Sequence, residues 1–238
     1  MNKILELDDV HAFYGEAHVL HGVSLVVQPG QVVCLIGRNG MGKSTTLKAI
    51  MGLVHVRKGG IYYRGEAITN WEPYKVFKKA IGYIPEDRRI FASLTVRENL
   101  LLGAYYAPKK KKRWTIEEVF KLFPVLKEKQ DRSGAMLSGG EQQMLAIARS
   151  LMSDPELLLI DEPCEGLAPI IVQELGAAIK RLYEEGLPIL LVEQSLKLSK
   201  ELGDYYYVLS KGQVVFSGDR QALFGDGDVI SKYLGVNV

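Results

Sequence analysis

The sequence has few of the residues that cross-link small secreted folds or bind metal clusters. Its 238 residues include two cysteines and four histidines. Neither Cys34, in the run VVCLIG, nor Cys164, after IDEP, has a second cysteine at metal-ligand spacing. This pattern argues against a disulfide framework and a cysteine-ligated metal site, and we expect both thiols to stay reduced in a cytosolic fold.

Long hydrophobic runs and an excess of one charge sign are also absent. No uninterrupted apolar stretch approaches the ~20 residues that a transmembrane helix needs, and the first ten residues, MNKILELDDV, lack the apolar run of a secretion signal. Thirty basic residues against 28 acidic ones leave a formal charge of +2, which gives no indication of nucleic-acid binding. The length still suffices for a sizeable core and about one to two domains.

Short apolar, β-branched runs alternate with helical patterns, which predicts an α/β fold with a mostly parallel sheet. Three continuous apolar runs are typical of strands buried on both faces, namely Val32–Gly37, Leu157–Asp161 and Pro188–Glu193. We interpret Ile61–Ile68 and Tyr205–Gly218 as parts of an antiparallel hairpin layer.

From about Asp87 to Met152 the strand patterns stop, and we expect a helical subdomain inserted into the α/β core. Thr95–Tyr106 and Thr115–Leu126 carry apolar residues at helical intervals. After a pair of glycines, one predicted buried stripe follows: Met144, Ile147, Ala148 and Leu151. The basic run Lys109–Arg113 fits either a solvated loop tip or a contact with anionic lipid head groups.

The run GRNGMGKST matches the phosphate-binding P-loop pattern, between a predicted buried strand and a predicted helix. Glycines allow backbone N–H groups to surround phosphates, Lys43 supplies a positive charge, and the Ser44 hydroxyl suits Mg²⁺. The candidate nucleotide-binding residues are Gly37, Arg38, Asn39, Gly40, Met41, Gly42, Lys43, Ser44 and Thr45.

An apolar strand ending in two carboxylates, LLLIDE, supplies the complement to the P-loop. We expect Asp161 to hold the metal, directly or through water, and Glu162 to polarise the water that attacks the γ-phosphate. These two motifs establish a P-loop NTPase and leave its class open.

A second glycine motif, LSGGE, lies between them and comprises Leu137, Ser138, Gly139, Gly140 and Glu141. A serine–glycine turn that feeds a helix N-terminus is a place to bind phosphate. With the order P-loop, helical insert, LSGGE and LLLIDEP, nearly the whole chain resembles the ATP-binding subunit of ABC transporters. The resemblance implies that LSGGE binds the γ-phosphate of ATP held by a second ATPase subunit, so that each subunit carries two half-sites.

The resemblance also implies a fold, cofactors and site roles. The fold is a RecA-like P-loop NTPase core (residues 1–86 and 153–238) with an antiparallel β subdomain and an inserted helical subdomain (residues 87–152). ATP and Mg²⁺ are the cofactors, with Ser44 and Asp161 on the metal and Glu162 as catalytic base. Tyr14 is the candidate for stacking on adenine, although a half-buried strand tyrosine is the rival interpretation.

Three positions depart from the usual pattern of this family. Glu86 stands where a glutamine usually contacts Mg²⁺; a carboxylate can still ligate the metal, and we keep Glu86 as a candidate metal and catalytic residue. Gln194 replaces a histidine, so it can hydrogen-bond a γ-phosphate without titrating near neutral pH. Ala168 replaces an aspartate that reaches across the dimer, so we expect looser communication between the two ATP sites.

These departures and the runs EPCEGLAP and LLVEQ resemble the LivF-type ATPases of branched-chain amino acid importers. The alternatives are the urea and amide importers, which usually keep glutamine at position 86, and the lipopolysaccharide-export ATPase, which usually keeps aspartate at 168 and histidine at 194. A soluble ABC ATPase acting on nucleic acid, or a regulator without hydrolysis, fits the sequence less well.

The same resemblance implies partners and a location. We expect a second ATPase subunit, either a cognate paralogue or another copy of this chain, and two transmembrane permeases, with a substrate-binding protein acting indirectly. We expect no nucleic-acid partner. The place of such a subunit is cytoplasmic, peripheral on the inner face of the cell membrane.

Overall fold

A six-stranded sheet in the order β10-β9-β3-β8-β7-β6 forms the centre of the computed structural model, which describes residues 3–105, 113–225 and 227–234. β3 (Val32–Ile36), β7 (Leu157–Asp161) and β8 (Ile189–Glu193) are buried at every residue, as the continuous apolar runs predicted. β6 (Ile81–Ile84) pairs with β7 in parallel and forms one edge of the sheet.

The hairpin predicted within Tyr205–Gly218 is present, but its assignment to the antiparallel layer is wrong. β9 (Tyr205–Ser210) pairs with β10 (Gln213–Asp219) in antiparallel fashion, yet it also pairs with β3 in parallel and so extends the central sheet. The reason is burial, since four consecutive residues of β9 are shielded from solvent and need cover on both faces.

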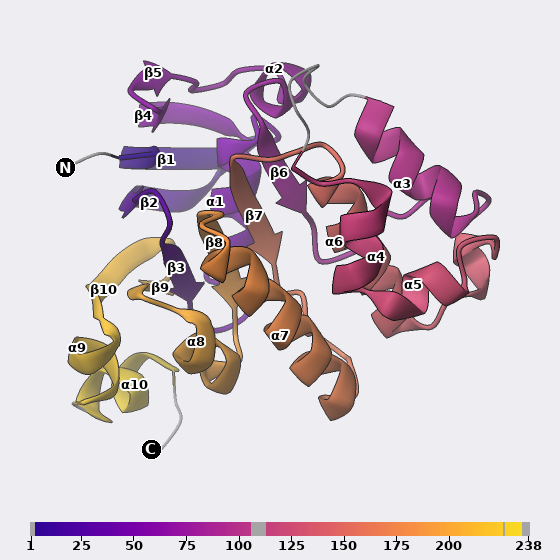
Figure 1. Cartoon of the computed structure of the whole chain (residues 1–238). Helices are drawn as coiled ribbons and strands as arrows, with labels where there is room; N and C mark the ends of the chain where they lie inside the picture. Colours follow the sequence, from indigo (N-terminus) through magenta and orange to yellow (C-terminus); the bar gives the residue numbers. More distant parts are fainter. Residues whose placement is uncertain (1–2, 106–112, 226, 235–238) are drawn as a thin grey trace.

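A separate antiparallel sheet, ordered β2-β1-β4-β5, comprises β1 (Leu5–Tyr14), β2 (Ala17–Val27), β4 (His55–Tyr63) and β5 (Glu66–Ala67). It lies beside the central sheet in Figure 1. α1 (Lys43–Ile50) packs between the two sheets, and Val33 and Leu35 of β3 face this side while Val32, Cys34 and Ile36 face the other core. The alternation follows from the two-residue period of a strand.

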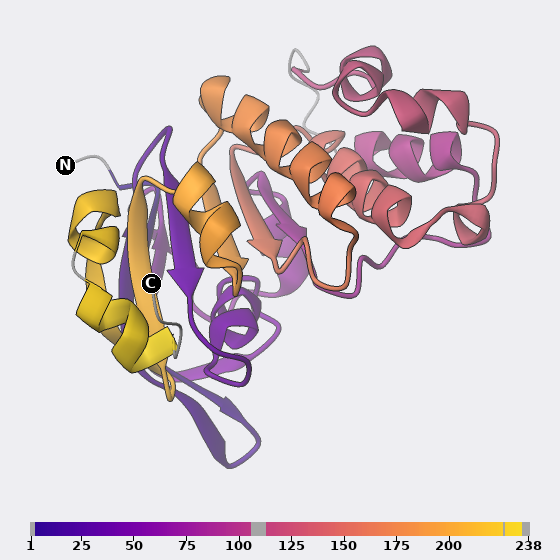
Figure 2. The same cartoon turned by 90° about the horizontal axis from the view of Figure 1, so that it is seen from below.

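Helices occupy the chain between β6 and β7 and form a lobe to one side of the sheets (Figures 1 and 2). This lobe contains α3 (Val96–Tyr105), α4 (Ile116–Leu122), α5 (Pro124–Glu128), a 3₁₀ turn (Gly134–Met136) and α6 (Gly139–Leu151). A shorter helix, α2 (Pro73–Phe77), comes before β6. The predicted stripe on α6 is confirmed, because its four members are at most 2% exposed.

The pattern Thr115–Leu126 is divided into two helices rather than one. Pro124 has no N–H to donate, and it moves the preceding residue, Phe123, out of helical geometry to φ −129° and ψ 79°. Of the basic run Lys109–Arg113, only Arg113 lies within the described residues; its guanidinium pairs with Glu185 at 3.1 Å.

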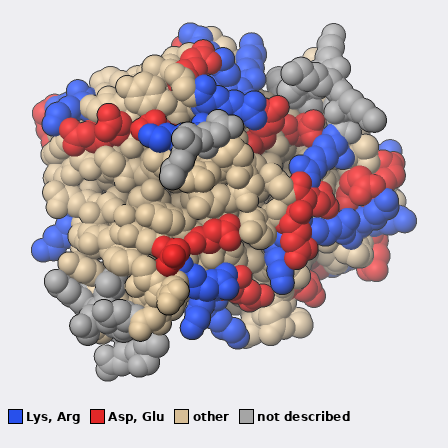
Figure 3. Space-filling view, turned by 60° about the vertical axis from the view of Figure 1, so that its left-hand side comes forward, with Lys and Arg blue, Asp and Glu red and all other residues tan. Residues whose placement is uncertain are grey.

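The remaining helices are α7 (Pro169–Glu184), α8 (Leu196–Leu202), α9 (Arg220–Phe224) and α10 (Gly227–Leu234). α7 and α8 pack together over the face of the central sheet opposite α1 (Figure 2). In the part of the chain that the structure describes, no helix has the length and apolarity to cross a bilayer. On the face in Figure 3, acidic and basic side chains lie interspersed around a broad uncharged area, so this face carries no patch of a single sign.

Ala168 occupies the N-cap of the 16-residue helix α7 and provides no side-chain acceptor for the first free N–H groups. We expect Ala168→Asp to raise the free energy of unfolding by about 0.5–2 kcal/mol, because aspartate caps helices well and its charge suits the positive helix end. Chemical denaturation measures this. Ala177→Asp, at an exposed position in the middle of the same helix, is the matched control and should lower stability; equal effects of the two substitutions would contradict the capping argument.

Candidate nucleotide site

The loop between β3 and α1 forms a cradle of backbone N–H groups. Gly40 and Gly42 have φ of 78° and 101°, which side chains rarely adopt. A Cβ on Gly37 would lie 2.4 Å from the carbonyl oxygen of Leu209, so only glycine fits there. α1 starts at Lys43 without a side-chain cap, and its first N–H groups therefore remain available to an anion.

This loop opens onto a cavity of about 320 Å³ at the carboxyl ends of the parallel strands. That edge of a sheet is where ligands bind in open α/β folds. The cavity brings together predicted residues from three separate stretches of the chain, and it is lined by Val19, Asn39, Gly40, Gly42, Lys43, Ser44, Thr45, Glu86, Glu162 and Glu165. Of the other P-loop residues, Arg38 accepts a hydrogen bond from Lys43 through its carbonyl oxygen, and Met41 anchors the loop to the β9–β10 turn through Gly212.

The central contact is a buried ion pair. Lys43 Nζ lies 2.9 Å from Glu162 Oε1, and the two side chains are only 2% and 9% exposed. Glu162 also has a φ of 42°, a backbone conformation that non-glycine residues rarely adopt and that is often found at functional sites. The ammonium group for phosphate and the candidate base therefore neutralise each other inside the cavity.

Asp161 and Ser44 form the second contact. The Ser44 hydroxyl donates to Asp161 Oδ1 at 2.9 Å, and the Tyr83 hydroxyl lies 3.5 Å from Oδ2. Burial raises the pKa of Asp161 to about 6, partly offset by the hydrogen bond from Ser44 and reinforced by the charge of Glu162. A cation bound to these oxygens would offset both the free-energy cost of burying a charged Asp161 and the repulsion between Asp161 and Glu162.

Glu165 is a site residue that the sequence reasoning missed. A hydrogen bond with Glu162 is the main reason why the pKa of Glu165 is raised, and the charge of Glu86 acts in the same direction. The available signal was its position three residues after Glu162, in the same loop. Among the described residues no three His, Cys, Asp or Glu side chains are arranged to hold a metal by themselves, as suits Mg²⁺, which takes one or two carboxylates and completes its shell with phosphates and water.

Gln194 lies in an adjoining cavity of about 330 Å³ rather than in the P-loop cavity itself. Glu162 and Glu165 line both cavities and connect them. The second cavity also contains Glu193, which is 3% exposed and which the sequence reasoning did not select. An acidic residue at the end of a buried apolar strand was the signal that could have found it.

The signature residues Leu137–Glu141 do not line the P-loop cavity of their own chain. Ser138 caps α6: its Oγ accepts the N–H of Glu141, while the Glu141 carboxylate accepts the N–H of Ser138 at 3.0 Å. Ser138 is exposed, Gly139 is half-buried and Leu137 is buried in the core. The second phosphate-binding candidate thus lies outside the cavity of the first.

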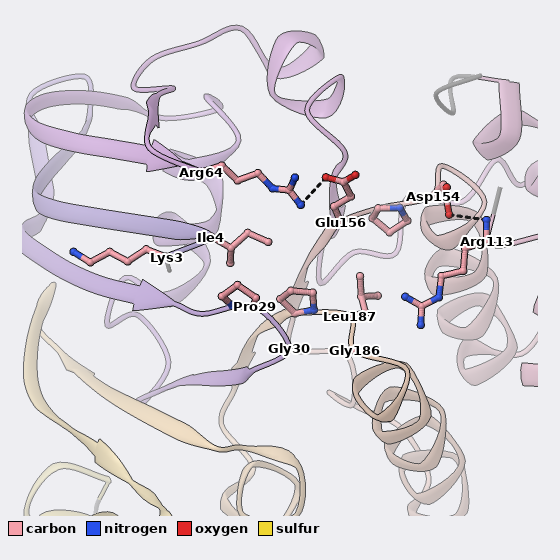
Figure 4. A pocket seen from close by; sticks show the side chains of 12 residues that line it. Lys3, Ile4, Pro29, Gly30, Arg64, Arg113, Asp154, Glu156, Gly186 and Leu187 are labelled. Carbon is pink, nitrogen blue, oxygen red and sulfur yellow. Dashed lines mark hydrogen bonds and ion pairs between the residues drawn. The ribbon is translucent and has the colours of Figure 1, made fainter. Parts of the chain in front are cut away.

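Tyr14 lies at the end of β1 with 47% of its surface exposed and does not line the cavity. Its role against adenine therefore remains a prediction. A different hollow of about 620 Å³ opens at the amino ends of the strands, on the far side of the sheet (Figure 4). Its cations already have acidic partners, since Arg64 pairs with Glu156 at 2.7 Å within the hollow and Lys3 and Arg113 pair with Glu6 and Glu185 outside its lining, so it is a poor competitor for the nucleotide.

Comparison with known proteins extends these observations. The family described as ABC transporter matches residues 20–165, which is more than half of the chain. The high-affinity branched-chain amino acid transport ATP-binding protein BraG of Pseudomonas aeruginosa is 43% identical, over 98% of this chain and 100% of its own length. The probable branched-chain amino acid transport ATP-binding protein LivF of Archaeoglobus fulgidus is 37% identical over 90% of this chain and 91% of its own.

Solved structures agree with the fold. The ADP conformation of MJ1267, an ATP-binding cassette of an ABC transporter, superposes with a TM-score of 0.82 at 30% identity, covering 99% of this chain and 100% of that one. A dimeric post-hydrolysis structure of the cassette MJ0796, bound to ADP and Pi, gives 0.79 at 25% identity over 91% and 98%. The predicted fold class is confirmed, and the chain belongs to the ATP-binding proteins of ABC transporters.

Proposed function

We propose that this chain powers an importer of branched-chain amino acids by hydrolysing ATP between two ATPase subunits. The observation that carries the ATPase part is the Lys43–Glu162 ion pair inside the P-loop cavity, where a phosphate-binding cation and a candidate base occupy one small space. The names of two full-length relatives, BraG and LivF, support the substrate class.

The residues of the cavity suit a magnesium–triphosphate complex. Ser44 and Asp161 would hold Mg²⁺, with Glu86 as a third oxygen ligand at the rim, and the acidic cluster already favours a cation there. When bound, the ion neutralises charge on the β- and γ-phosphates. Lys43 binds the same phosphates, which frees Glu162 Oε1 to orient the attacking water and accept its proton.

A second subunit completes the site. The N-terminus of α6 presents Ser138 and Gly139 at the surface, away from the chain's own cavity, so they are placed to reach a phosphate on another molecule. The dimeric MJ0796 cassette supports such a pairing. Ala168 and Glu86 favour a cognate paralogue as the partner in the cell, because these departures suit two unequal sites, and we expect the purified chain, without that paralogue, to pair with a second copy of itself.

An apolar groove of about 760 Å³ between α2, α3 and α6 is the proposed seat of a cytoplasmic permease helix. Its walls include large, exposed apolar side chains, namely Leu53, Tyr74, Phe91 and Leu102. An amphipathic helix binds a groove of this kind through its apolar face. The groove adjoins β6 and the Glu86 loop, so its occupant is next to the nucleotide, and we place the subunit on the cytoplasmic face of the membrane.

Glu162→Gln removes the base and keeps the shape of the side chain. We expect ATP turnover to fall by about 10²–10⁴-fold, while ATP still binds and the proposed dimer accumulates. Light scattering in ATP and Mg²⁺ should then show a particle of twice the 26.5 kDa chain mass. Adding Ser138→Phe, which blocks the N-terminus of α6, should restore the monomer. If the Glu162→Gln chain alone stays a monomer in ATP and Mg²⁺, that result would argue against a dimer of two copies of this chain.

Gln194→His would introduce a group with a pKa near 6.5 beside the γ-phosphate. In the wild-type chain Gln194 does not titrate, so it should contribute no pH dependence to ATP affinity between about pH 5.5 and 7.5. In the variant, affinity should rise as the pH falls through this range, because the charged imidazolium attracts phosphate. The measurement is the KM for ATP against pH, with Gln194→Asn as the non-titrating control, and identical profiles for both variants would contradict the assignment.

Deleting the gene should lower cellular uptake of radiolabelled leucine, isoleucine and valine by more than about tenfold, because an ABC importer stops without its ATPase. The intact gene should restore uptake, and a copy with Lys43→Ala should not. Loss of urea uptake instead would assign the chain to the amide branch. A defect in lipopolysaccharide export with normal amino acid uptake would assign it to the exporter branch.

A further inference from the structure

Glu193 is a buried acid that the hydrolytic mechanism above leaves without a role. It is the last residue of β8, between β3 and β7, and only 3% of it is exposed. Burial raises the pKa of its carboxyl group, the N–H of Ser195 acts against this, and the charge of Glu162 raises it further. A buried acid is costly to keep, so its contacts indicate what it does.

One carboxylate oxygen of Glu193 holds the turn that leaves the strand. Oε2 accepts the backbone N–H groups of Gln194 and Ser195, each at 3.1 Å. Ser195 then caps α8, its Oγ accepting the N–H of Leu198 at 3.4 Å. The Gln194 side chain is exposed and makes no hydrogen bond of its own among the described residues, so its placement depends on its backbone.

The same carboxyl group faces the loop that follows Glu162. Cys164 of that loop interacts with Glu193, and burial, followed by the charge of Glu193, raises the pKa of the thiol to about 12, so it remains S–H. The other oxygen, Oε1, is buried and has no hydrogen-bond partner in the described part of the chain. Glu193, Gln194 and Glu162 all line the cavity of about 330 Å³ between the two loops.

We propose that Glu193 is a positioning residue for ATP hydrolysis, whose carboxylate fixes the backbone of Gln194 and Ser195 against the loop that carries Glu162. This backbone contact thereby holds the Gln194 amide where the γ-phosphate would bind, although the Gln194 side chain makes no hydrogen bond of its own among the described residues. This inference rests on the proposed function, because it gives Glu193 a part in the same reaction. A carboxylate suits the task because one of its oxygens accepts two N–H groups at once.

Substitutions separate positioning from simple stabilisation. Glu193→Gln keeps an oxygen at the position of Oε2 that can accept both N–H groups, while its amide nitrogen replaces Oε1, which has no hydrogen-bond partner among the described residues. We therefore expect the kcat of this variant to lie within about twofold of the wild-type value. Glu193→Ala leaves both N–H groups without an acceptor, and we expect kcat to fall about tenfold with the ATP dissociation constant nearly unchanged. Equal kcat in Glu193→Ala and wild type would overturn the proposal.

A double-mutant cycle with Gln194→Ala tests whether Glu193 acts through Gln194. If it does, adding Glu193→Ala to Gln194→Ala should lower kcat by no more than about twofold further. If the fold-losses in kcat of the two single variants instead multiply in the double variant, Glu193 acts in some other way and the proposal is overturned. Glu193→Met serves if the alanine variant does not fold, because it fills a similar buried volume and supplies no oxygen acceptor for the two N–H groups.

Amide hydrogen exchange gives a readout that does not depend on activity. In the nucleotide-free chain, Glu193→Ala or Glu193→Met should speed exchange at Gln194 and Ser195 by about tenfold or more, with unchanged exchange in β3 and β7. Unchanged exchange at Gln194 and Ser195 would overturn the proposal even in an inactive chain. If the wild-type chain shows no ATPase activity while the Glu193 variants still show this faster exchange, the proposed function is wrong but the role of Glu193 in fixing the turn stands.

Discussion

The buried contact between Lys43 and Glu162 is the constraint on which the site depends. Two opposite charges, almost free of solvent, lie 2.9 Å apart: Lys43 at the start of α1 and Glu162 directly after β7. Removing one partner of such a pair typically costs about 3–5 kcal/mol, because the other charge stays buried and uncompensated. The pair holds both side chains inside the cavity. In the proposed mechanism a triphosphate replaces Glu162 as the partner of Lys43, and the Glu162 carboxylate becomes available to water beside that phosphate.

The sheet explains why so many polar groups meet there. β3, β8, β7 and β6 are parallel, so the P-loop, the Gln194 turn, the loop after Glu162 and the Glu86 loop all start from one edge. Both faces of these strands are buried between helices and a second sheet, and polar groups find room only where the strands end. The opposite edge holds a larger hollow, yet the cations of that hollow already have acidic partners. Among the described residues, the carboxyl edge combines a helix N-terminus with a buried cation and an excess of carboxylates.

Two of the three departures from the family pattern make the site more negative. With Glu86 and Gln194 in place of an amide and an imidazole, the site gains a carboxylate and loses a titratable cation, and Glu165 adds another acid beside Glu162. Lys43 is therefore the main balance to these carboxylates inside the cavity. The placement of an uncharged Gln194 is left to its backbone, for which Glu193 supplies the acceptor. The third departure, Ala168, removes a carboxylate instead and leaves α7 without a side-chain N-cap.

The sequence by itself determined the fold class, the family and which residues of the P-loop and of the LLLIDE run meet, because these depend on local patterns: glycines with a lysine and a hydroxyl at fixed spacing, and apolar runs that end in acids. Lys43, Ser44, Asp161 and Glu162 accordingly lie together as expected. Only the tertiary structure decided which sheet receives β9, how Pro124 divides a helix, and that Glu165 and Glu193 belong to the site. These features depend on contacts between residues far apart in the chain, and neighbouring residues indicate them only weakly, because an acid near Glu162 or at the end of an apolar run can equally well face solvent.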